Sequence, residues 1–274
     1  MQRFVTHRLA VMGAVLLLMV SLVAIFAPWV ATHDPLDQDL GSRLLPPSKE
    51  HFFGTDTLGR DLFSRVVYGA RVSLIVGPIA AAISLTLGLI VGCTSGYFGG
   101  RVDLVLQRVV DVVMCIPSFF LILAIVAMFG SSMVMTMVVI GLVHWTSPAR
   151  LIRGEFLRVR QLEFAEAARA LGVSDMKIMW RHLLPNIIAP VIVQTTLFVA
   201  AAILIEAGLS YLGLGTQPPQ PSWGNILTLG GRVLHRAWWV ATFPGAMIFL
   251  TIMALNLLGD GLRDALDPRQ HTSG

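Results

Sequence analysis

Apolar runs long enough to cross a lipid bilayer constrain this chain more than any other feature of its sequence. A membrane-spanning helix needs about 20 consecutive, predominantly apolar residues. The chain contains six such runs, at residues 9–27, 72–93, 109–129, 133–145, 187–205 and 240–258. The fourth run is the shortest and reaches across a bilayer only if residues 148–152 continue it. The sequence therefore predicts an all-α membrane protein with six transmembrane helices.

The composition agrees with this prediction. Charged residues make up 13% of the 274 residues, whereas a soluble domain carries about 25%. The first run also exceeds the apolar core of a cleaved signal peptide, which holds about 7–15 residues. The Pro28-Trp29 pair that follows this run suits a membrane interface. We therefore expect the first run to be retained as a transmembrane helix.

Basic residues set the expected orientation, because cytoplasmic segments of membrane proteins carry an excess of Lys and Arg. If the N-terminus is cytoplasmic, 13 of the 20 basic residues fall in cytoplasmic segments. The net charge of +4 follows from this bias and requires no nucleic-acid partner. The expected divisions are a cytoplasmic N-terminus with the first helix (1–31), an extracytoplasmic loop (32–71), a membrane domain of five helices (72–258) with a long polar connection at about 153–185, and a cytoplasmic tail (259–274).

The connection between the fourth and fifth runs contains a polar, helix-forming island, EFAEAARALGVSDMKIMWRHLLPN, at residues 163–186. Residues 158–171 are rich in Ala, Leu, Glu and Arg, which favour a helix. Gly172 can supply the left-handed residue that ends it, and Ser174 can cap a second short helix. Pro185 stands where the chain returns to the membrane.

Three interpretations of this island stay open on spacing alone. A connector lying on the membrane surface is favoured, and a docking element for a partner protein comes second. A DNA-binding helix–turn–helix is a distant third, because about 34 residues between two spans cannot let a domain leave the membrane.

The segment EAARALG, with HLLP nine residues later, resembles the EAA motif of bacterial ABC importer permeases. That motif reads Glu-Ala-Ala, three residues, Gly, nine residues and then Ile-x-Leu-Pro. His182 replaces the usual Ile, a departure familiar in the peptide/nickel branch of the family. The matching positions are Glu166, Ala167, Ala168, Gly172, Leu184 and Pro185.

Further blocks of sequence resemble the second permease subunit of dipeptide, oligopeptide or nickel importers. They are FGTDTLGRDLFSRVVYGARVSL (53–74), GYFGGRVD (96–103), EAGLSYLGLG with PPQPSWG (206–224) and NLLGDGLRDALDP (256–268). Together with the EAA motif they extend the resemblance over nearly the whole chain, from residue 9 to residue 268.

This resemblance implies the fold of a type I ABC importer permease in a bacterial inner membrane, with both termini cytoplasmic. The island is then a cytoplasmic coupling helix that fits a cleft on an ATP-hydrolysing subunit, which displaces the passive connector as the preferred interpretation. Arg169, beside the EAA residues, offers a charged contact to that subunit. The implied partners are a homologous permease, one or two ABC ATPases, an extracytoplasmic substrate-binding protein and membrane lipid. Peptides are the first expectation for the cargo, and nickel or a metal chelate the second.

No cofactor is expected on this chain. A GxxxxGK[ST] phosphate loop is absent, and neither lysine, Lys49 or Lys177, follows a glycine. The resemblance places ATP and Mg²⁺ on partner subunits. The two cysteines, Cys93 and Cys115, lie in apolar runs without metal-ligand spacing, so no metal site is expected.

Two carboxylates at the ends of apolar runs are notable, because a charge in lipid is costly and usually faces a cavity or partner. For Asp111 we favour an ion pair with Arg108 or another cytoplasmic arginine. Glu206 lines the transport pathway or its outer gate, or makes an interaction at its helix end. Ser210 and Trp223, in the Gly- and Pro-rich stretch after Glu206, are further candidates for the pathway or gate.

Gly88 and Gly92, four residues apart in the second run, form a small-residue packing face. Packing within this chain is the default interpretation, and contact with the partner permease is the alternative.

Two rival functions are weaker. An intramembrane enzyme could use Ser210 with His144, but the second glycine of a nucleophile elbow is missing after Gly208-Leu209-Ser210. A channel or secondary transporter needs ionisable residues in mid-membrane, and the two carboxylates lie near span ends. We therefore expect a non-catalytic permease subunit.

Overall fold

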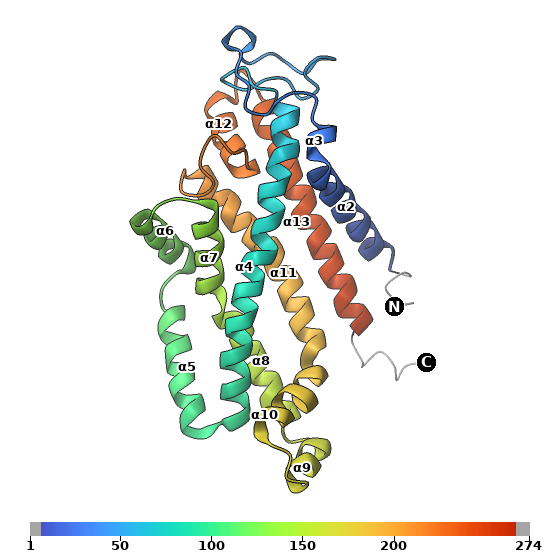
Figure 1. Ribbon diagram of the computed structural model, residues 1–274, viewed down its shortest axis with the longest axis vertical. Coiled ribbons are helices and arrows are strands. Elements are labelled where there is room, and N and C mark those ends of the chain that lie inside the picture. Colours follow the sequence, from blue (N-terminus) through green and yellow to red (C-terminus); the bar gives the residue numbers. More distant parts are fainter. Residues whose placement is uncertain (1–6, 267–274) are drawn as a thin grey trace.

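The protein is an elongated bundle of helices in a computed structural model that describes residues 7–266 (Figure 1). In the described residues, β structure is limited to an isolated bridge between Thr55 and Asp61. The helices are α2 (Arg8–Ile25), α3 (Ala27–Val30), η1 (Leu40–Ser42), α4 (Leu62–Phe98), α5 (Gly100–Met114), α6 (Ser118–Phe129), α7 (Met133–His144), α8 (Thr146–Val159), α9 (Glu163–Ala170), α10 (Asp175–Lys177), η2 (Ile178–Leu183), α11 (Leu184–Tyr211), α12 (Trp223–Val233) and α13 (Trp239–Leu266).

Five helical stretches in the described part of the chain are long and apolar enough to cross a membrane. One of them joins α7 and α8 over Met133–Val159, so the short fourth run does borrow the residues that follow it. Helices α5 and α6 count as a sixth span only as a pair bent by 78°. The prediction of an all-α membrane protein is confirmed, but the run at residues 109–129 is not one straight helix. It breaks before Pro117, which lacks the amide hydrogen that a continuing helix needs.

Helix α4 begins ten residues earlier than the predicted boundary between loop and membrane domain. Its first residue is Leu62, and the Asp61 side chain caps it by accepting from the Ser64 amide. Arg65 lies in the segment predicted as loop, yet its guanidinium is buried beside Asp56 at 3.4 Å and donates to the Pro35 carbonyl. Asp56 and the Pro35 carbonyl offset part of the cost of burying this charge, so the helix can begin within the polar stretch.

The other end of the predicted membrane domain also shifts. Helix α13 continues to Leu266, past residue 259, where the tail was expected to begin. The cytoplasmic placement predicted for residues 1–6 and 267–274 lies outside the described residues.

Helices α4 and α8 pack at very short range. A Cβ atom on Gly88 would lie 2.8 Å from Pro148, and one on Gly92 would lie 2.7 Å from the Ala149 carbonyl oxygen. Gly96 repeats the pattern one turn later against Phe156. The small-residue face of α4 therefore packs within this chain, as the default interpretation held.

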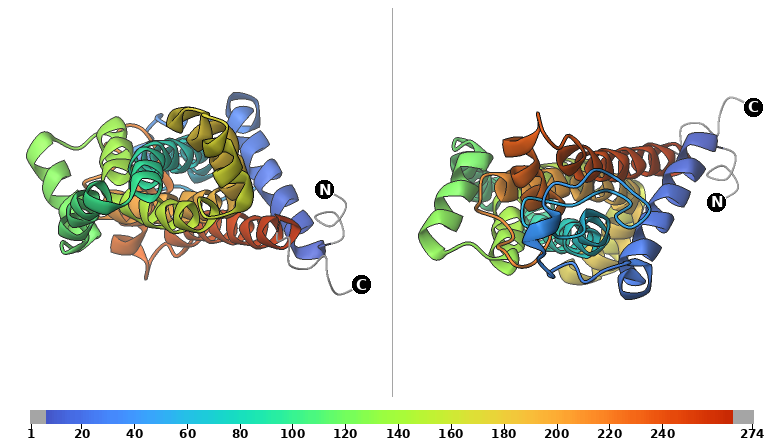
Figure 2. Two further views of the ribbon diagram at one scale, coloured as in Figure 1. Left: turned by 90° about the horizontal axis from the view of Figure 1, so that it is seen from below. Right: turned by 90° about the horizontal axis from the view of Figure 1, so that it is seen from above.

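The two ends of the bundle differ in character. The upper end in Figure 1 carries the segment 31–61, the loop 212–222 and α12, and the lower end carries α9 and α10. Seen along the long axis, α2 lies at one edge beside α13, and α6 projects at the opposite edge (Figure 2). A buried cluster around Ile152, Phe156 and Ile178 supports the lower end, and another around Leu62 and Trp223 supports the upper end.

Candidate functional site

Helix α9, which carries the EAA residues, is amphipathic across its two faces. Ala165 and Ala168, three residues apart, are buried in the lower cluster. Glu166, Ala167 and Arg169 are exposed on the other face of the helix. The small buried alanines let α9 lie close to the bundle while the motif's other residues face outward.

Gly172 ends this helix as predicted. Its φ is +73°, a left-handed conformation in which a side chain is strained. The Gly172 amide donates to the Arg169 carbonyl at 2.9 Å, and the Val173 amide donates to the Ala168 carbonyl at 3.1 Å. This is the paired hydrogen-bond pattern of a helix C-terminus closed by glycine.

The predicted bounds of the two short helices are wrong, although Gly172 does end the first one. The first helix does not begin at residue 158, because the chain turns at residues 160–162 between α8 and α9. Ser174 occupies the N-cap position of α10, but its side chain accepts no capping hydrogen bond. The second helix is not separate either, since Asp175–Tyr211 forms one membrane-length stretch.

A π-helical turn, η2, lies inside that long stretch, and no sequence pattern indicated it. It spans Ile178–Leu183 and ends where the Leu184 amide donates to the Met179 carbonyl. Leu184 is half-buried against the lower cluster, and Pro185 is exposed. Such turns interrupt helices frequently at functional sites, and this one places the last two motif residues at the base of α11.

Contacts of Arg160, Tyr97 and Asp175, which the sequence did not single out, clamp the island and the turn before it against the end of α4. Arg160 donates to the carbonyls of Gly96 and Tyr97 at 3.1 and 3.0 Å. The Tyr97 hydroxyl donates to Asp175 at 2.6 Å. Arg169 lies 5.7 Å from the Tyr97 ring centroid, within cation–π range, and donates to the Arg160 carbonyl. The island is therefore bound to α4 through the Tyr97–Asp175 hydrogen bond, which no sequence motif indicated, and through Arg169.

Two ion pairs then join α8 to α5. Arg153 forms a two-point salt bridge with Asp103, with both N–O distances at 2.6 Å. Asp111 pairs with Arg150 at 2.6 Å. Of the two predicted alternatives, the partner is therefore not Arg108 but a different arginine. The Arg150–Asp111 pair is nearly half exposed and contributes little stability, whereas the bidentate pair is better shielded.

The outward surface of the island exposes large apolar side chains beside the motif. Leu171 is 82% exposed and Met176 is 65% exposed. Phe164 and Trp180 add partly exposed aromatic rings to the same tip. An apolar surface next to charged residues is typical of a site that a protein partner or a membrane surface covers.

Glu206 lies at the upper end in a buried polar cluster. Its Oε1 atom accepts from the Ser210 hydroxyl at 2.6 Å and from the Thr216 hydroxyl at 3.2 Å. The Ser210 hydroxyl in turn accepts from the Thr216 amide. This is an interaction at the helix end, which ties the loop after α11 to that helix. Glu206 is only 1% exposed, so its role in a pathway or gate stays a prediction that requires this loop to move.

Trp223 is an anchor for α12 in this conformation. The ring is fully buried, and its Nε1 atom donates to the Val66 carbonyl of α4 at 3.0 Å. Ser222 caps α12 just before it, through a reciprocal pair of hydrogen bonds with Asn225. The pathway role considered for Trp223 also stays a prediction.

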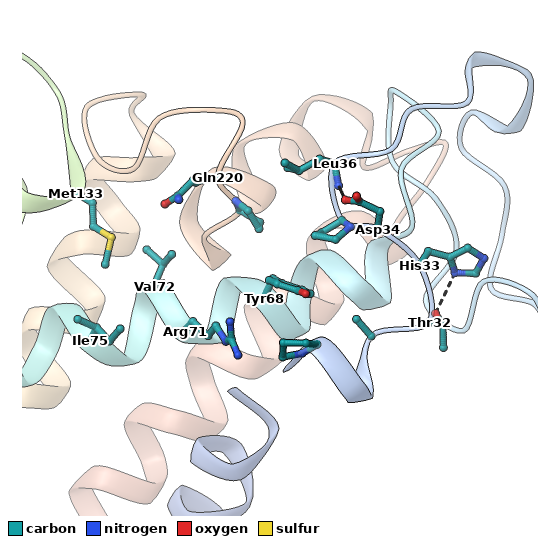
Figure 3. A pocket seen from close by; sticks show the side chains of 14 residues that line it. Thr32, His33, Asp34, Leu36, Tyr68, Arg71, Val72, Ile75, Met133 and Gln220 are labelled. Atoms are coloured by element: carbon teal, nitrogen blue, oxygen red, sulfur yellow. Dashed lines mark hydrogen bonds between the residues drawn. The ribbon is translucent and has the colours of Figure 1, made fainter. Parts of the chain in front are cut away.

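A pocket of about 820 Å³ opens at the upper end, between the 31–36 segment, α4 and the Gln220-Pro221 pair. Figure 3 shows Tyr68 and Arg71 on the face of α4 that borders it. Arg71 donates to the Ala24 and Ile25 carbonyls and so ties α4 to the end of α2.

Comparison of the sequence with protein families gives two matches. The profile described as "Binding-protein-dependent transport system inner membrane component" matches residues 84–272. The profile described as "N-terminal TM domain of oligopeptide transport permease C" matches residues 1–47.

Individual relatives extend the similarity over almost the whole chain. The "Probable D,D-dipeptide transport system permease protein DdpC" of Escherichia coli is 44% identical over 261 residues, which cover 95% of this chain and 88% of that one. The "Dipeptide transport system permease protein DppC" of Bacillus subtilis is 40% identical, with 98% of this chain and 84% of that one covered.

A solved structure shares the fold. An inward-facing conformation of the MetNI methionine ABC transporter superimposes with a TM-score of 0.62 at 17% identity. The superposition covers 74% of this chain and 96% of that one. At this identity the likeness concerns the fold alone, and it supports the predicted type I permease architecture.

Proposed function

This chain belongs to the family of binding-protein-dependent transport system inner membrane components, and from that premise we propose that it forms, with a homologous permease, the membrane pathway of an ATP-driven importer of dipeptides or oligopeptides. The relatives above are named for dipeptide transport, so nickel or a metal chelate is not favoured as cargo. The chain is a non-catalytic, multi-pass component of the inner membrane, and family membership replaces the channel and the intramembrane enzyme as interpretations.

The observation that carries this proposal is the two-sided nature of α9. This helix is fixed to the bundle on one face by the buried Ala165 and Ala168, and Arg169 lies over the Tyr97 ring of α4. Its outer face leaves Glu166 and Leu171 uncovered. A helix that is firmly attached on one side and uncovered on the other suits the transmission of movement from a partner into the bundle.

In this proposal an ABC ATPase subunit covers the outer face of α9. ATP and Mg²⁺ bind to that subunit, and this chain contributes no phosphate-binding group. When the ATPases close, α9 moves, and the Arg160–Tyr97–Asp175 contacts carry the movement into α4 and α11. The chain's own task is mechanical, and it forms no covalent intermediate.

The proposal also assigns the two ends of the bundle to the two sides of the membrane. The lower end and both termini face the cytoplasm, where the ATPases work. The upper end faces the extracytoplasmic side and meets the substrate-binding protein. The buried Glu206–Ser210–Thr216 cluster then holds the loop 212–222 in a closed position, and passage of cargo requires that loop to open.

Reversal of one exposed charge tests the coupling role. In Glu166→Arg, a larger side chain of opposite charge replaces an exposed carboxylate of α9. We expect peptide-stimulated ATP hydrolysis and uptake by the reconstituted transporter to fall at least tenfold. The amount of folded protein in the membrane stays unchanged.

Asp260→Arg provides the matched control. Asp260 is an exposed carboxylate on α13, outside the island. The same charge reversal there should leave uptake near the level of the unmodified protein. Normal uptake in Glu166→Arg would refute the coupling role of α9. Purification without an ATPase or a second permease would refute the importer itself.

A further inference from the structure

Two histidines and an aspartate meet at the upper end, although no spacing motif connects them in the sequence. They are His33, which follows α3, His51 in the long loop, and Asp61 at the start of α4. One potential ligand atom from each residue lies within 4.8 Å of those from the other two. The fold thus brings imidazole and carboxylate groups from three separate segments to one point.

Both imidazoles approach the same carboxylate oxygen. The Nδ1 atom of His51 lies 2.9 Å from the Oδ1 atom of Asp61, and the Nδ1 atom of His33 lies 3.7 Å from it. The two rings are 4.9 Å apart, with 35° between their planes. In a tetrahedral zinc site with bonds of about 2.0–2.1 Å, neighbouring ligand atoms are about 3.3 Å apart. The distances from the Asp61 Oδ1 atom to the two Nδ1 atoms, 2.9 and 3.7 Å, lie on either side of that value.

Asp61 is held in the orientation that a metal ligand needs. Its side chain is 1% exposed, and its Oδ2 atom accepts from the Ser64 amide at 2.8 Å. The Thr32 hydroxyl also lies 3.5 Å from Oδ2. One oxygen therefore fixes the carboxylate to the start of α4, and Oδ1 remains directed at the histidines. Such outer contacts orient ligands in metal sites.

The histidines are similarly placed by their surroundings. The His33 amide donates to the Ser64 hydroxyl at 3.0 Å. The Nδ1 atom of His33, which faces Asp61, is itself 3.0 Å from the Thr32 hydroxyl (Figure 3). The His51 side chain is 14% exposed and that of His33 is 39% exposed. The cluster is thus anchored on its inner side and open to solvent on the His33 side.

The nearby arginines do not neutralise Asp61. Arg60 pairs with Asp56 at 2.7 Å, and Arg65 lies 3.4 Å from the same carboxylate. A single carboxylate with two neutral imidazoles carries one negative charge, which favours a divalent cation.

From this geometry we infer that His33, His51 and Asp61 bind one divalent transition-metal ion of the Zn²⁺ type. Imidazole nitrogen and carboxylate oxygen are ligands that Zn²⁺ accepts, and a fourth position remains on the exposed side for water. The ion links the segment after α3 and the long loop to the start of α4. This site is separate from cargo transport and does not depend on the proposed function.

Zinc binding to the purified full-length chain tests the inference. The protein is prepared in mild detergent with its co-purifying subunits, carries an affinity tag without histidine, and is stripped with a chelator. Titration with Zn²⁺ alone, without peptide or nucleotide, is followed by calorimetry and by elemental analysis after desalting. We expect one Zn²⁺ per chain, with a dissociation constant in the micromolar range or below. Binding should also protect residues 31–61 from proteolysis.

Substitutions at the cluster distinguish this site from other metal binding. His33→Ala and Asp61→Asn should each weaken binding by about tenfold or more, since even loss of an outer contact costs about 10–100-fold. Asn keeps the cap on α4, and His33 is exposed, so both variants retain their fold. His235→Ala, at an exposed histidine near the same end, should bind like the unmodified chain. Absence of a Zn²⁺ ion in the unmodified chain, or equal affinity in His33→Ala, would show that the cluster is only a hydrogen-bonded group.

Discussion

Ala167 and Ala168 are identical neighbours whose surroundings are opposite. Ala168 is 5% exposed in the lower cluster, and Ala167 is exposed on the outer face of α9. The EAA motif requires a small residue at both positions, but for different reasons in this fold. The first leaves room for a partner, and the second leaves room for the bundle.

The same substitution at these two residues should therefore have different effects. Ala168→Leu inserts a larger side chain into a packed cluster and should lower the free energy of unfolding by about 1–3 kcal/mol. Ala167→Leu should leave that free energy unchanged but reduce ATPase co-purification and peptide uptake. Thermal unfolding in detergent and a pull-down measure the two effects. Equal destabilisation by both variants would contradict the assignment of the faces.

At the scale of elements, the contact between α4 and α8 forms a stiff pair of helices beside the island. Three glycines at intervals of four residues, Gly88, Gly92 and Gly96, let the two backbones approach closely. The clamp at Tyr97 begins one residue after the last of them. Movement of α9 therefore meets two helices that are already packed as one unit.

Enlargement of the middle glycine tests this pairing. In Gly92→Leu the new side chain would meet the Ala149 carbonyl and Ile152 at less than 3 Å. We expect loss of about 1–3 kcal/mol or more in stability, because backbone atoms cannot move aside easily. Gly154→Ala on α8 is the control. A Cβ atom there meets nothing within 4 Å, and the change should raise helix stability by up to about 1 kcal/mol. Chemical denaturation in micelles compares the two, and a tolerated Gly92→Leu would refute close packing.

The sequence predicted which segments are long and apolar enough to cross the membrane better than it predicted where those helices bend or begin. Hydropathy depends on composition, so the apolar residues on both sides of Pro117 read as one run although the chain bends there. The polar residues before residue 72 led to the prediction of a loop where α4 has already begun. A buried arginine such as Arg65, next to Asp56, cannot be told from an exposed one in the sequence.

The candidate site divides in the same way. The EAA positions and Gly172 follow a motif with fixed spacing, and sequence alone placed them. Tyr97, Arg160 and Asp175 meet only through the tertiary fold, and the π-helical turn has no spacing signal. The burial of Glu206 depends on the path of the loop after α11, which hydropathy does not describe.

At the scale of the whole molecule, the proposed orientation assigns the segment 31–61 and the island to opposite sides of the membrane. A cysteine placed at Asp37 or at Ser174, in a background without Cys93 and Cys115, tests this. Both positions are exposed. A membrane-impermeant maleimide added to intact cells should label Asp37→Cys at once and Ser174→Cys only after the membrane is opened. The reverse labelling pattern would show that the topology is the opposite of the proposed one. Labelling of both cysteines in intact cells would contradict the assignment of the two segments to opposite sides.

Helix α4 touches both working ends of the molecule. Its 37 residues extend about 56 Å at 1.5 Å per residue, whereas the hydrocarbon core is about 30 Å thick. Its first turn begins at Asp61, and its last turn holds Tyr97 and the clamp to the island. A single rod that joins two binding surfaces gives a physical route for coupling between them, and any such coupling is reciprocal by thermodynamic necessity. If nucleotide binding below changes the affinity for the binding protein above by some factor, then the binding protein changes the nucleotide affinity by that same factor. Paired titrations on one preparation would measure this factor from both sides, and a factor of one would mean that α4 does not couple the two ends.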